Sequence, residues 1–544
     1  MLCDLLLNKV YFINIQENKG DNRMNNNLEK ERIEEAEVFM YKKKISKFVL
    51  FLLAAVIAIF ASCHKNNEKI TELRYGFTTE PKTLDPLNTT NATADGRSIL
   101  FNVFEGLVKP GTDGSFQPCI AESWTTERET LIYNFTIRDG VYFHDGSVVT
   151  AKDVKFSIDT AAAAGFDGLN RIDNIAVMSN NLIKITLKTP DPEFLPYVTV
   201  GIVKADNNNR EKNVIGTGPF LLESFTPQRD LVLKKFDKYW QRQLIQPQNV
   251  PYLDKVTIVF FANVEAMIIA LRSGNIDGAN LVGSYAVQLD QSKFDIIDSY
   301  SAAVHLLALN NASPPLNDVR VRKAINYGVD VQGIIDGAFF GKGTPSGSPI
   351  IPGLSTYYDG SLSYPYDPQK ARSLLADAGF NDARKLSLEI TVASEYSMHV
   401  DTAQVIVDQL KKIGINVSIN LVDWNTWLSD VYRGRNYQAT IISLDSPTVS
   451  ARSFLARYES VNSGNFINFS NKEFDRTFDA LLTETNEVKR KQLYNDAQHI
   501  IISDAASVYI QDIFYYKVFR IGAFKGALNY PLYVIDFASI YVTK

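Results

Sequence analysis

The stretch from Ala121 to Asp159 limits the possible folds of this chain more than any other part of it. It begins with a strand pattern, in which apolar side chains alternate with mostly polar ones. The apolar members are Leu131, Tyr133, Phe135 and Ile137. The turn dipeptides Asp139-Gly140 and Asp145-Gly146 then enclose a short second strand at Val141 and Phe143. The stretch therefore predicts a β-rich segment with tight turns.

A helix is predicted directly after the second turn. Thr150 precedes Ala-Lys-Asp, a Ser/Thr-x-x-Asp arrangement that satisfies free N–H groups at a helix start. Val154 and Ile158 give this helix an apolar face. None of these elements carries chemistry by itself, so a function has to be inferred from the wider pattern.

Three parts of this stretch form one long, ordered motif. They are Ala-Glu-Ser-Trp at 121–124, Tyr-x-Phe-x-Ile-Arg-x-Gly-Val-x-Phe-His-Asp-Gly at 133–146, and Thr-Ala-x-Asp-Val-x-Phe-Ser at 150–157. The motif closely resembles the signature of the peptide-binding type, family 5, of extracellular solute-binding proteins, which feed ABC importers. Further matches occur in the family's order, at Pro81-x-Thr-Leu-Asp-Pro86, Glu105-Gly-Leu-Val108, Gly216-Thr-Gly-Pro219 and Lys238-Tyr-Trp240.

The resemblance implies an α/β, two-lobed periplasmic-binding-protein type II fold, with an extra β-rich subdomain inserted in the first lobe. Residues 1–62 would be a possible mis-called start plus a signal peptide, and 63–69 a lipidated Cys and tether. The remaining predicted segments are 70–110 (lobe I, first part), 111–212 (inserted subdomain), 213–304 (lobe I, second part), 305–508 (lobe II) and 509–544 (return to lobe I).

The N-terminal region has the features of an export signal. The apolar run from Phe48 to Phe60 is shorter than the ~20 residues that a membrane span needs. Lysines precede it from Lys42 onward and Ala61-Ser62-Cys63 follows, as in a cleavable secretory signal. A Cys after small residues resembles a bacterial lipobox, so acylated Cys63 would anchor the protein to the lipid bilayer on the periplasmic or cell-surface side. The alternative to cleavage and acylation at Cys63 is an uncleaved helical anchor that ends at this residue. Translation is predicted to start at Met40.

Periodicity predicts the other elements. Strands are expected at 73–77, near 183, and at 305–310, 386–392, 415–422 and 508–510. Helices are expected at 99–108, 264–273, from 316, 368–378, 402–413, 472–482 and 488–503. The order strand, helix, strand over 386–422 implies a parallel pair with a crossover helix, and hence an α/β lobe.

Composition excludes some classes of partner. The net charge is -5, whereas a nucleic-acid-binding protein needs a clustered excess of Lys and Arg. Cys119 is the one cysteine outside the N-terminal segment, so no intramolecular disulfide framework is expected. Cys119 is therefore predicted to be a small buried apolar residue. We expect a monomer that needs no cofactor.

The ligand residues are predicted from the resemblance. In peptide-binding members a carboxylate late in the second lobe pairs with the ligand's free ammonium group, and by position this is Asp445, unless Asp445 is a loop or helix-cap residue. Ser443 and Leu444 would pair by backbone with an extended peptide. The loop with Glu80 and Pro81 would face them, and Trp424 would flank the cleft unless it packs in the core. Arg452 and Arg457 are weaker candidates for a ligand carboxylate. The chain departs from the family at Ile441-Ile442, where Gly-Trp is usual.

The predicted function is a lipid-anchored binding protein that captures short peptides in the cleft and delivers them to an ABC permease. The alternative is a nickel, metal-chelate or other small-solute binder of the same fold, although the five histidines show no pair at metal-ligand spacing and no metal residue is assigned. An exported hydrolase is a remote alternative, because the sequence has no Gly-x-Ser-x-Gly, His-Glu-x-x-His or Walker motif. We therefore predict that the protein is not an enzyme.

Overall fold

The computed structural model describes residues 71–89, 91–243, 250–381, 384–446 and 448–543. The predicted start at Met40, the signal segment and Cys63 lie outside the described residues. Within these ranges, no helix combines the length and the apolar character that crossing a membrane requires.

One mixed sheet of eleven strands runs through the described molecule. Ten of its strands follow the order β15-β14-β16-β12-β17-β11-β1-β10-β9-β8, and β13 pairs with β17. Their bounds are β1 Glu72–Phe77, β8 Phe220–Thr226, β9 Asp230–Lys235, β10 Lys255–Phe260, β11 Gly278–Val282, β12 Phe294–Leu309, β13 Thr344–Pro345, β14 Leu386–Ala393, β15 Ile415–Val422, β16 Ala439–Asp445 and β17 Ser507–Arg520.

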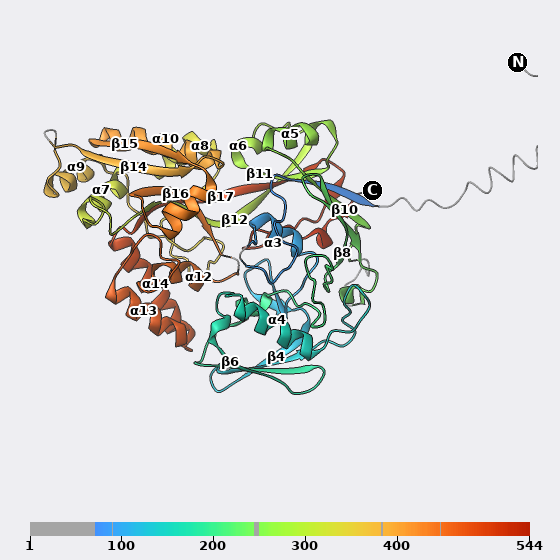
Figure 1. The fold of residues 1–544 in the computed structure, drawn as a ribbon. Helices are drawn as coiled ribbons and strands as arrows, with labels where there is room; N and C mark the ends of the chain where they lie inside the picture. The colour runs from blue at the N-terminus through green and yellow to red at the C-terminus, as the bar shows by residue number, and fades with distance from the viewer. Residues whose placement is uncertain (1–70, 90, 244–249, 382–383, 447, 544) are drawn as a thin grey trace, which may run out of the picture. The chain divides into compact units, whose positions relative to one another are not determined.

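The long strands β12 and β17 join the two halves of this sheet (Figure 1). They pair antiparallel from Phe294 to Ala308, with register shifts between Tyr300 and Leu306. Strand β11 pairs with the C-terminal part of β17. Strand β16 pairs with the C-terminal part of β12. We call residues 71–299 and 515–543 lobe I, and residues 304–510 lobe II.

Lobe I contains a second, smaller sheet. Its order is β4-β5-β7-β6, with β4 at Ala121–Glu127, β5 at Ile132–Ile137, β6 at Ile172–Val177 and β7 at Leu182–Leu187. Phe135 and Ile183 of this sheet belong to the same hydrophobic cluster as Tyr75 and Ile258 of the large sheet. The β-rich segment therefore shares the core of lobe I.

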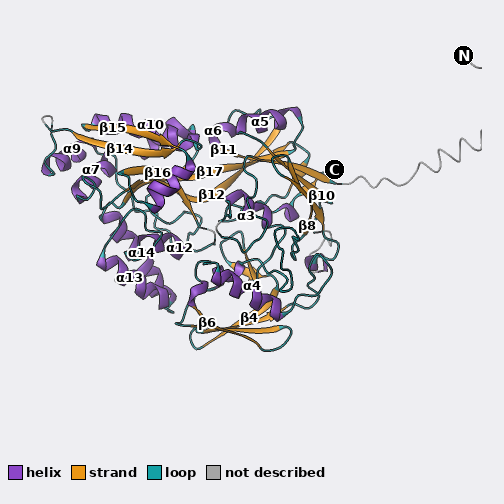
Figure 2. Ribbon diagram, viewed as in Figure 1, coloured by secondary structure: helices purple, strands orange, loops and turns teal. Residues whose placement is uncertain are grey.

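Helices cover both faces of the lobe II sheet (Figure 2). Adjacent strand residues point to opposite faces, so Leu307 and Ile441 join one cluster and Leu306 and Ile442 join the other. The first face packs on α7 Val319–Gly328, α8 Val331–Phe339, α9 Pro368–Asp377 and α10 Ser397–Lys412. The second packs on α12 Ala451–Leu455, α13 Lys472–Thr483 and α14 Glu487–Ser503.

Several locally encoded elements are confirmed. Strands β14 and β15 are parallel, with Leu386 opposite Ile415, and α10 connects them. Helix α5, Val264–Ser273, ends at Gly274, whose φ of 80° lies in the left-handed region that favours glycine. Helix α4, Ala151–Ala163, begins with the predicted capping arrangement. The remaining elements are β2 Val108–Pro110, β3 Phe116–Pro118, α6 Gly283–Ala286, α11 Trp424–Thr426, β18 Phe524–Lys525 and β19 Tyr541–Val542.

Several predicted elements are wrong in their bounds, among them the strand expected at 508–510, which is the longer β17. The helix expected at 99–108 is α3, Ala94–Leu100, and Val108 begins a strand. Thr93 caps α3 by accepting from the Gly96 N–H at 3.0 Å, and after the helix Asn102 binds backbone groups of the distant C-terminal segment. The strand predicted at Val141 and Phe143 is only an isolated bridge between Tyr142 and Val148. Helix α10 begins before Thr402, and β12 begins well before His305.

The capping carboxylate of α4 gives a stability prediction. Asp153 Oδ2 accepts from the Thr150 backbone N–H at 3.0 Å, and Oδ1 accepts from the Ala205 N–H at 2.9 Å. We expect Asp153→Ala to lower the free energy of unfolding by about 1–2 kcal/mol, because two backbone donors lose their acceptor. Urea unfolding measures this change. The exposed, ion-paired Asp159 on the same helix is the control, since Asp159→Ala should cost less than about 0.5 kcal/mol.

Candidate ligand site between the lobes

A cavity of about 220 Å³ lies where lobe I meets the end of β16. Lobe I lines it with Arg97 of α3, the segment around Thr83 and the C-terminal segment around Tyr533. Lobe II contributes Asp445 and the residues that follow it, including Val449. Because both lobes supply walls, a molecule bound here would touch both.

Asp445 and Arg97 form an ion pair inside this cavity. Arg97 Nη2 lies 2.5 Å from Asp445 Oδ2, and the two side chains are 36% and 38% exposed. Asp445 is the last residue of β16, so it is neither a loop residue nor a helix cap. Its backbone carbonyl accepts from Arg457 Nη2, which fixes the strand end. The predicted ammonium-binding carboxylate is therefore accessible from the cavity and already bound to a cation of the other lobe.

Acidic residues outnumber basic ones around the cavity. The acidic lining residues are Asp85, Glu105, Asp167, Asp445 and Asp536, against Arg97 and Lys109. Most of these acids have their own partners, for example Asp85, whose Oδ2 lies 2.9 Å from Arg210 Nε. Aromatic rings complete the walls at Phe101, Phe104, Tyr197, Tyr530 and Tyr533. Such a lining suits a small molecule with a positive charge and some apolar surface.

Glu105 is a buried carboxylate at the base of this region. Its Oε1 accepts from Tyr239 OH at 2.8 Å and from Cys119 Sγ at 3.5 Å. Its Oε2 accepts from Trp240 Nε1 at 2.9 Å and from Thr217 Oγ1 at 3.1 Å. Burial raises the pKa of Glu105, and the hydrogen bonds from Trp240, Tyr239 and Cys119 oppose the shift. The contacts join three of the motifs that the sequence singled out, and they confirm that Cys119 is a buried structural residue.

His144 has a structural role in the same region. Its Nδ1 accepts from the Gly216 N–H at 3.2 Å, so the protonated Nε2 donates to the Gly218 carbonyl at 3.1 Å. Burial lowers the pKa of His144 to about 4. The neutral imidazole therefore holds the tight crossover that carries Thr217.

Of the six predicted ligand residues, only Asp445 lines the cavity. Glu80 accepts from the Gln228 N–H at 2.7 Å, and Pro81 is buried beside α3. Trp424 stacks on Trp427 with 4.9 Å between ring centroids, which is the aromatic packing given as its alternative. Leu444 packs against the second core cluster of lobe II. Roles for these residues in ligand binding stay predictions.

Ser443 takes part in a directed chain of hydrogen bonds with two buried histidines. The Thr402 hydroxyl donates to the Met398 carbonyl, so it accepts from His305 Nε2 at 3.1 Å. His305 Nδ1 then accepts from Ser443 Oγ at 3.0 Å, and Ser443 Oγ accepts from His399 Nε2 at 3.2 Å. These bonds can all form with both rings neutral. Among the described residues, the hydrogen-bond partners of these two rings are hydroxyl groups.

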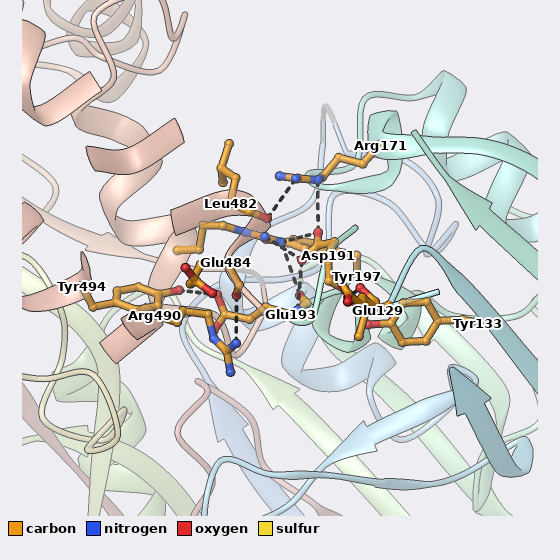
Figure 3. A network of polar contacts seen from close by, with 12 residues as sticks. Glu129, Tyr133, Arg171, Asp191, Glu193, Tyr197, Leu482, Glu484, Arg490 and Tyr494 are labelled. Atoms are coloured by element: carbon orange, nitrogen blue, oxygen red, sulfur yellow. Dashed lines mark hydrogen bonds and ion pairs between the residues drawn. The ribbon is translucent and has the colours of Figure 1, made fainter. Parts of the chain in front are cut away.

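A buried ion network joins the lobes beside the cavity (Figure 3). Arg452 of α12 binds both oxygens of Asp191 in lobe I, at 2.8 and 3.0 Å, and these side chains are 4% and 0% exposed. Arg171 Nε lies 3.1 Å from Asp191 Oδ2, and Arg171 Nη2 donates to the Leu482 carbonyl across the interface. Arg452 is thus held by Asp191, which removes it as a candidate for a ligand carboxylate.

A second interlobe contact extends this network. In Figure 3, Tyr494 reaches from lobe II toward Glu193 of lobe I, and its hydroxyl donates to Glu193 Oε2 at 2.7 Å. Ser453, next to Arg452, donates to Asp167 Oδ2 at 2.8 Å. The segment after Asp445 therefore carries both a wall of the cavity and two of the contacts between the lobes, those of Arg452 and Ser453.

The family is shown by a comparison with known proteins. The middle-domain model of bacterial extracellular solute-binding proteins, family 5, matches residues 115–466, more than half of the chain. The chain belongs to this family, whose members are the substrate-binding proteins of ABC importers. This assignment confirms the predicted family and the two-lobed α/β class, and it supports a role other than catalysis.

Particular relatives cover most of the chain. The glutathione-binding protein GsiB of Salmonella typhi is 27% identical over 77% of this chain and 84% of its own. The oligopeptide-binding protein OppA of Bacillus subtilis is 25% identical over 81% and 87%. The structure of NikZ from Campylobacter jejuni in complex with Ni(L-His) has a TM-score of 0.74 at 22% identity, over 86% and 99%. Within the described residues, no group of three His, Cys, Asp or Glu side chains is placed to hold a metal ion.

The Asp191 network predicts a large, coupled loss of stability. Asp191→Asn leaves the buried Arg452 and the partly buried Arg171 without their anion, so we expect the free energy of unfolding to fall by about 3–5 kcal/mol. Adding Arg452→Met should cost about 1–3 kcal/mol less than the sum of the single changes, because the second change removes a charge that the first had left unpaired. Urea unfolding of the four proteins tests this. Additive changes would show that the pair is not coupled.

The buried histidines predict a loss of stability in acid. Burial lowers the pKa of His399 to about 3 and the pKa of His305 well below its usual value. Below about pH 6.5 these histidines are therefore protonated in the unfolded chain but stay neutral in the folded protein. The free energy of unfolding consequently falls as the pH drops toward 3. Each histidine should contribute up to about 1.4 kcal/mol per pH unit.

Urea unfolding between pH 7 and pH 4 measures that slope. His399→Gln should reduce it by the contribution of one histidine, even though the variant is less stable at pH 7. The matched control is His499→Gln, because His499 is 61% exposed, and this change should leave the slope nearly as it was. An unchanged slope in His399→Gln would contradict the assignment.

Proposed function

We propose that this substrate-binding protein captures short peptides in the cavity between its lobes and delivers them to an ABC permease. The observation that carries the proposal is the Asp445 carboxylate, which faces the cavity at the end of β16 and lies 2.5 Å from a cation. A free peptide brings an ammonium group whose loss of water has to be compensated, and a fixed carboxylate provides that compensation. The names of the relatives GsiB and OppA, a glutathione-binding and an oligopeptide-binding protein, support the same ligand class.

The mechanism is a clamp. A peptide that touches α3 and the C-terminal segment on one side and the end of β16 on the other gains these contacts together only when the lobes are close. Binding therefore shifts an open–closed equilibrium toward the closed form, by as much as the difference between the affinities of the two forms. The register shifts in the β12–β17 pair mark the place where the connection can bend.

The remaining parts of the proposal concern place and partners. Acylation of Cys63 would hold the protein on the outer surface of the membrane that contains the permease, and more than one acyl chain would make that anchoring stable. Closure presents both lobes to the permease in one fixed arrangement. One copy of the chain supplies both walls of the cavity, so a monomer is sufficient for binding.

Thermal unfolding of the purified protein with di- to pentapeptides tests the ligand class. A ligand at a hundred times its Kd adds about 2.7 kcal/mol to the stability, which raises the Tm visibly. Peptides with a free amino group should raise the Tm, whereas N-acetylated peptides should not. Asp445→Asn should abolish this rise in Tm. Asp408 is exposed on α10, so Asp408→Asn is the control and should keep the rise.

The same assay can overturn the proposal. Nickel and nickel–histidine are the comparison ligands. A Tm shift with these, and none with any peptide, would assign the protein to metal-chelate binding and remove the role of Asp445. Equal shifts with free and acetylated peptides would keep the ligand class but contradict the ammonium contact.

A further inference from the structure

Arg97 forms an ion pair with the Asp445 carboxylate across the cavity. It projects from α3, the lobe I helix whose start is capped by Thr93. Its guanidinium reaches the carboxylate that the proposed function assigns to the ligand's ammonium group. Any ammonium that binds Asp445 therefore has to share this carboxylate with Arg97 or displace it.

A displaced Arg97 needs a new anion. Leaving a guanidinium unpaired between two closed lobes costs more than it would in open water. The other acids that line the cavity already have donors: Arg210 binds Asp85, the Tyr530 hydroxyl donates to Asp536 at 2.9 Å, and Ser453 donates to Asp167. The most direct replacement is an anionic group that the ligand itself brings.

We propose that Arg97 is a specificity-determining residue that binds the ligand's carboxylate while Asp445 binds its ammonium group. The inference rests on the proposed function and narrows its ligand class to compact zwitterions, of which a dipeptide is the simplest. Arg97 suits this task because its planar fork of N–H donors matches a carboxylate.

The geometry sets the length of the ligand. Asp445 and Arg97 are close enough to share one ion pair, so the two charges of a ligand placed between them have to be close as well. An extended chain grows by about 3.3–3.6 Å per residue, which moves the termini of a pentapeptide too far apart to reach both poles. The cavity of about 220 Å³ is also smaller than the ~300–1,000 Å³ usual for larger ligands. Dipeptides should therefore bind better than pentapeptides.

Calorimetric titration of the full chain tests this with four probes: dialanine, dialanine amide, N-acetyl-dialanine and penta-alanine. For the wild type we expect amidation to weaken binding at least tenfold, since it removes the charge that faces Arg97. Arg97→Gln should bind dialanine and its amide within twofold of each other, and Arg97→Lys should restore part of the difference. Arg476→Gln, an exposed arginine on α13, is the matched control and should keep the full tenfold preference.

The ratio of the two affinities separates a specificity role from a structural one. If Arg97 only holds α3 against lobe II, Arg97→Gln weakens both probes equally and the ratio stays at the wild-type value, which overturns the inference. A wild type that binds dialanine and its amide equally, or that prefers penta-alanine, overturns it as well and leaves the peptide function standing. Binding of none of the four probes overturns the proposed function together with this inference.

Discussion

The cavity wall in lobe I depends on one buried carboxylate. Glu105 accepts from four side chains on three separate segments, so it fixes those segments relative to α3, which ends a few residues before it. Gly106, the next residue, is required at this point, because a Cβ there would lie 2.5 Å from the backbone of Thr199 in another wall of the cavity. Fully satisfied buried networks of this kind specify one arrangement of the chain. The lobe I wall of the cavity is therefore set by polar contacts as much as by apolar packing.

Local signals predicted those parts of the fold that short-range contacts determine. The capping arrangement of α4, the stop of α5 at Gly274 and the parallel β14–β15 pair depend on residues within one element or its direct connection. The end of α3 could not be predicted in this way. Asn102 follows that helix and bonds to Ile535 and Phe537, more than four hundred positions away, so tertiary contacts decide where the helix stops.

The candidate site also contains one residue that the sequence predicted and several contacts that it did not. The family resemblance predicted Asp445 from its position late in lobe II, and this residue lines the cavity. Arg97 belongs to none of the motifs. Its contact with Asp445 and the pair between Asp191 and Arg452 could not be predicted from local sequence, because hundreds of residues separate the partners. A pattern with period two or 3.6 reports which face of an element is apolar. It carries no information about which charges from two distant segments will meet.

The continuous sheet has a consequence for the free energy of closure. Because β12 and β17 are hydrogen-bonded strands rather than a flexible linker, the lobes never diffuse apart, and facing groups meet at a high effective concentration. Bringing Arg97 and Asp445 together therefore costs little of the entropy that two separate molecules would lose on association. On the proposed function, a small solute with only a few contacts would then be enough to shift the protein toward its closed form, and a ligand the size of a dipeptide would control the surfaces of two large lobes.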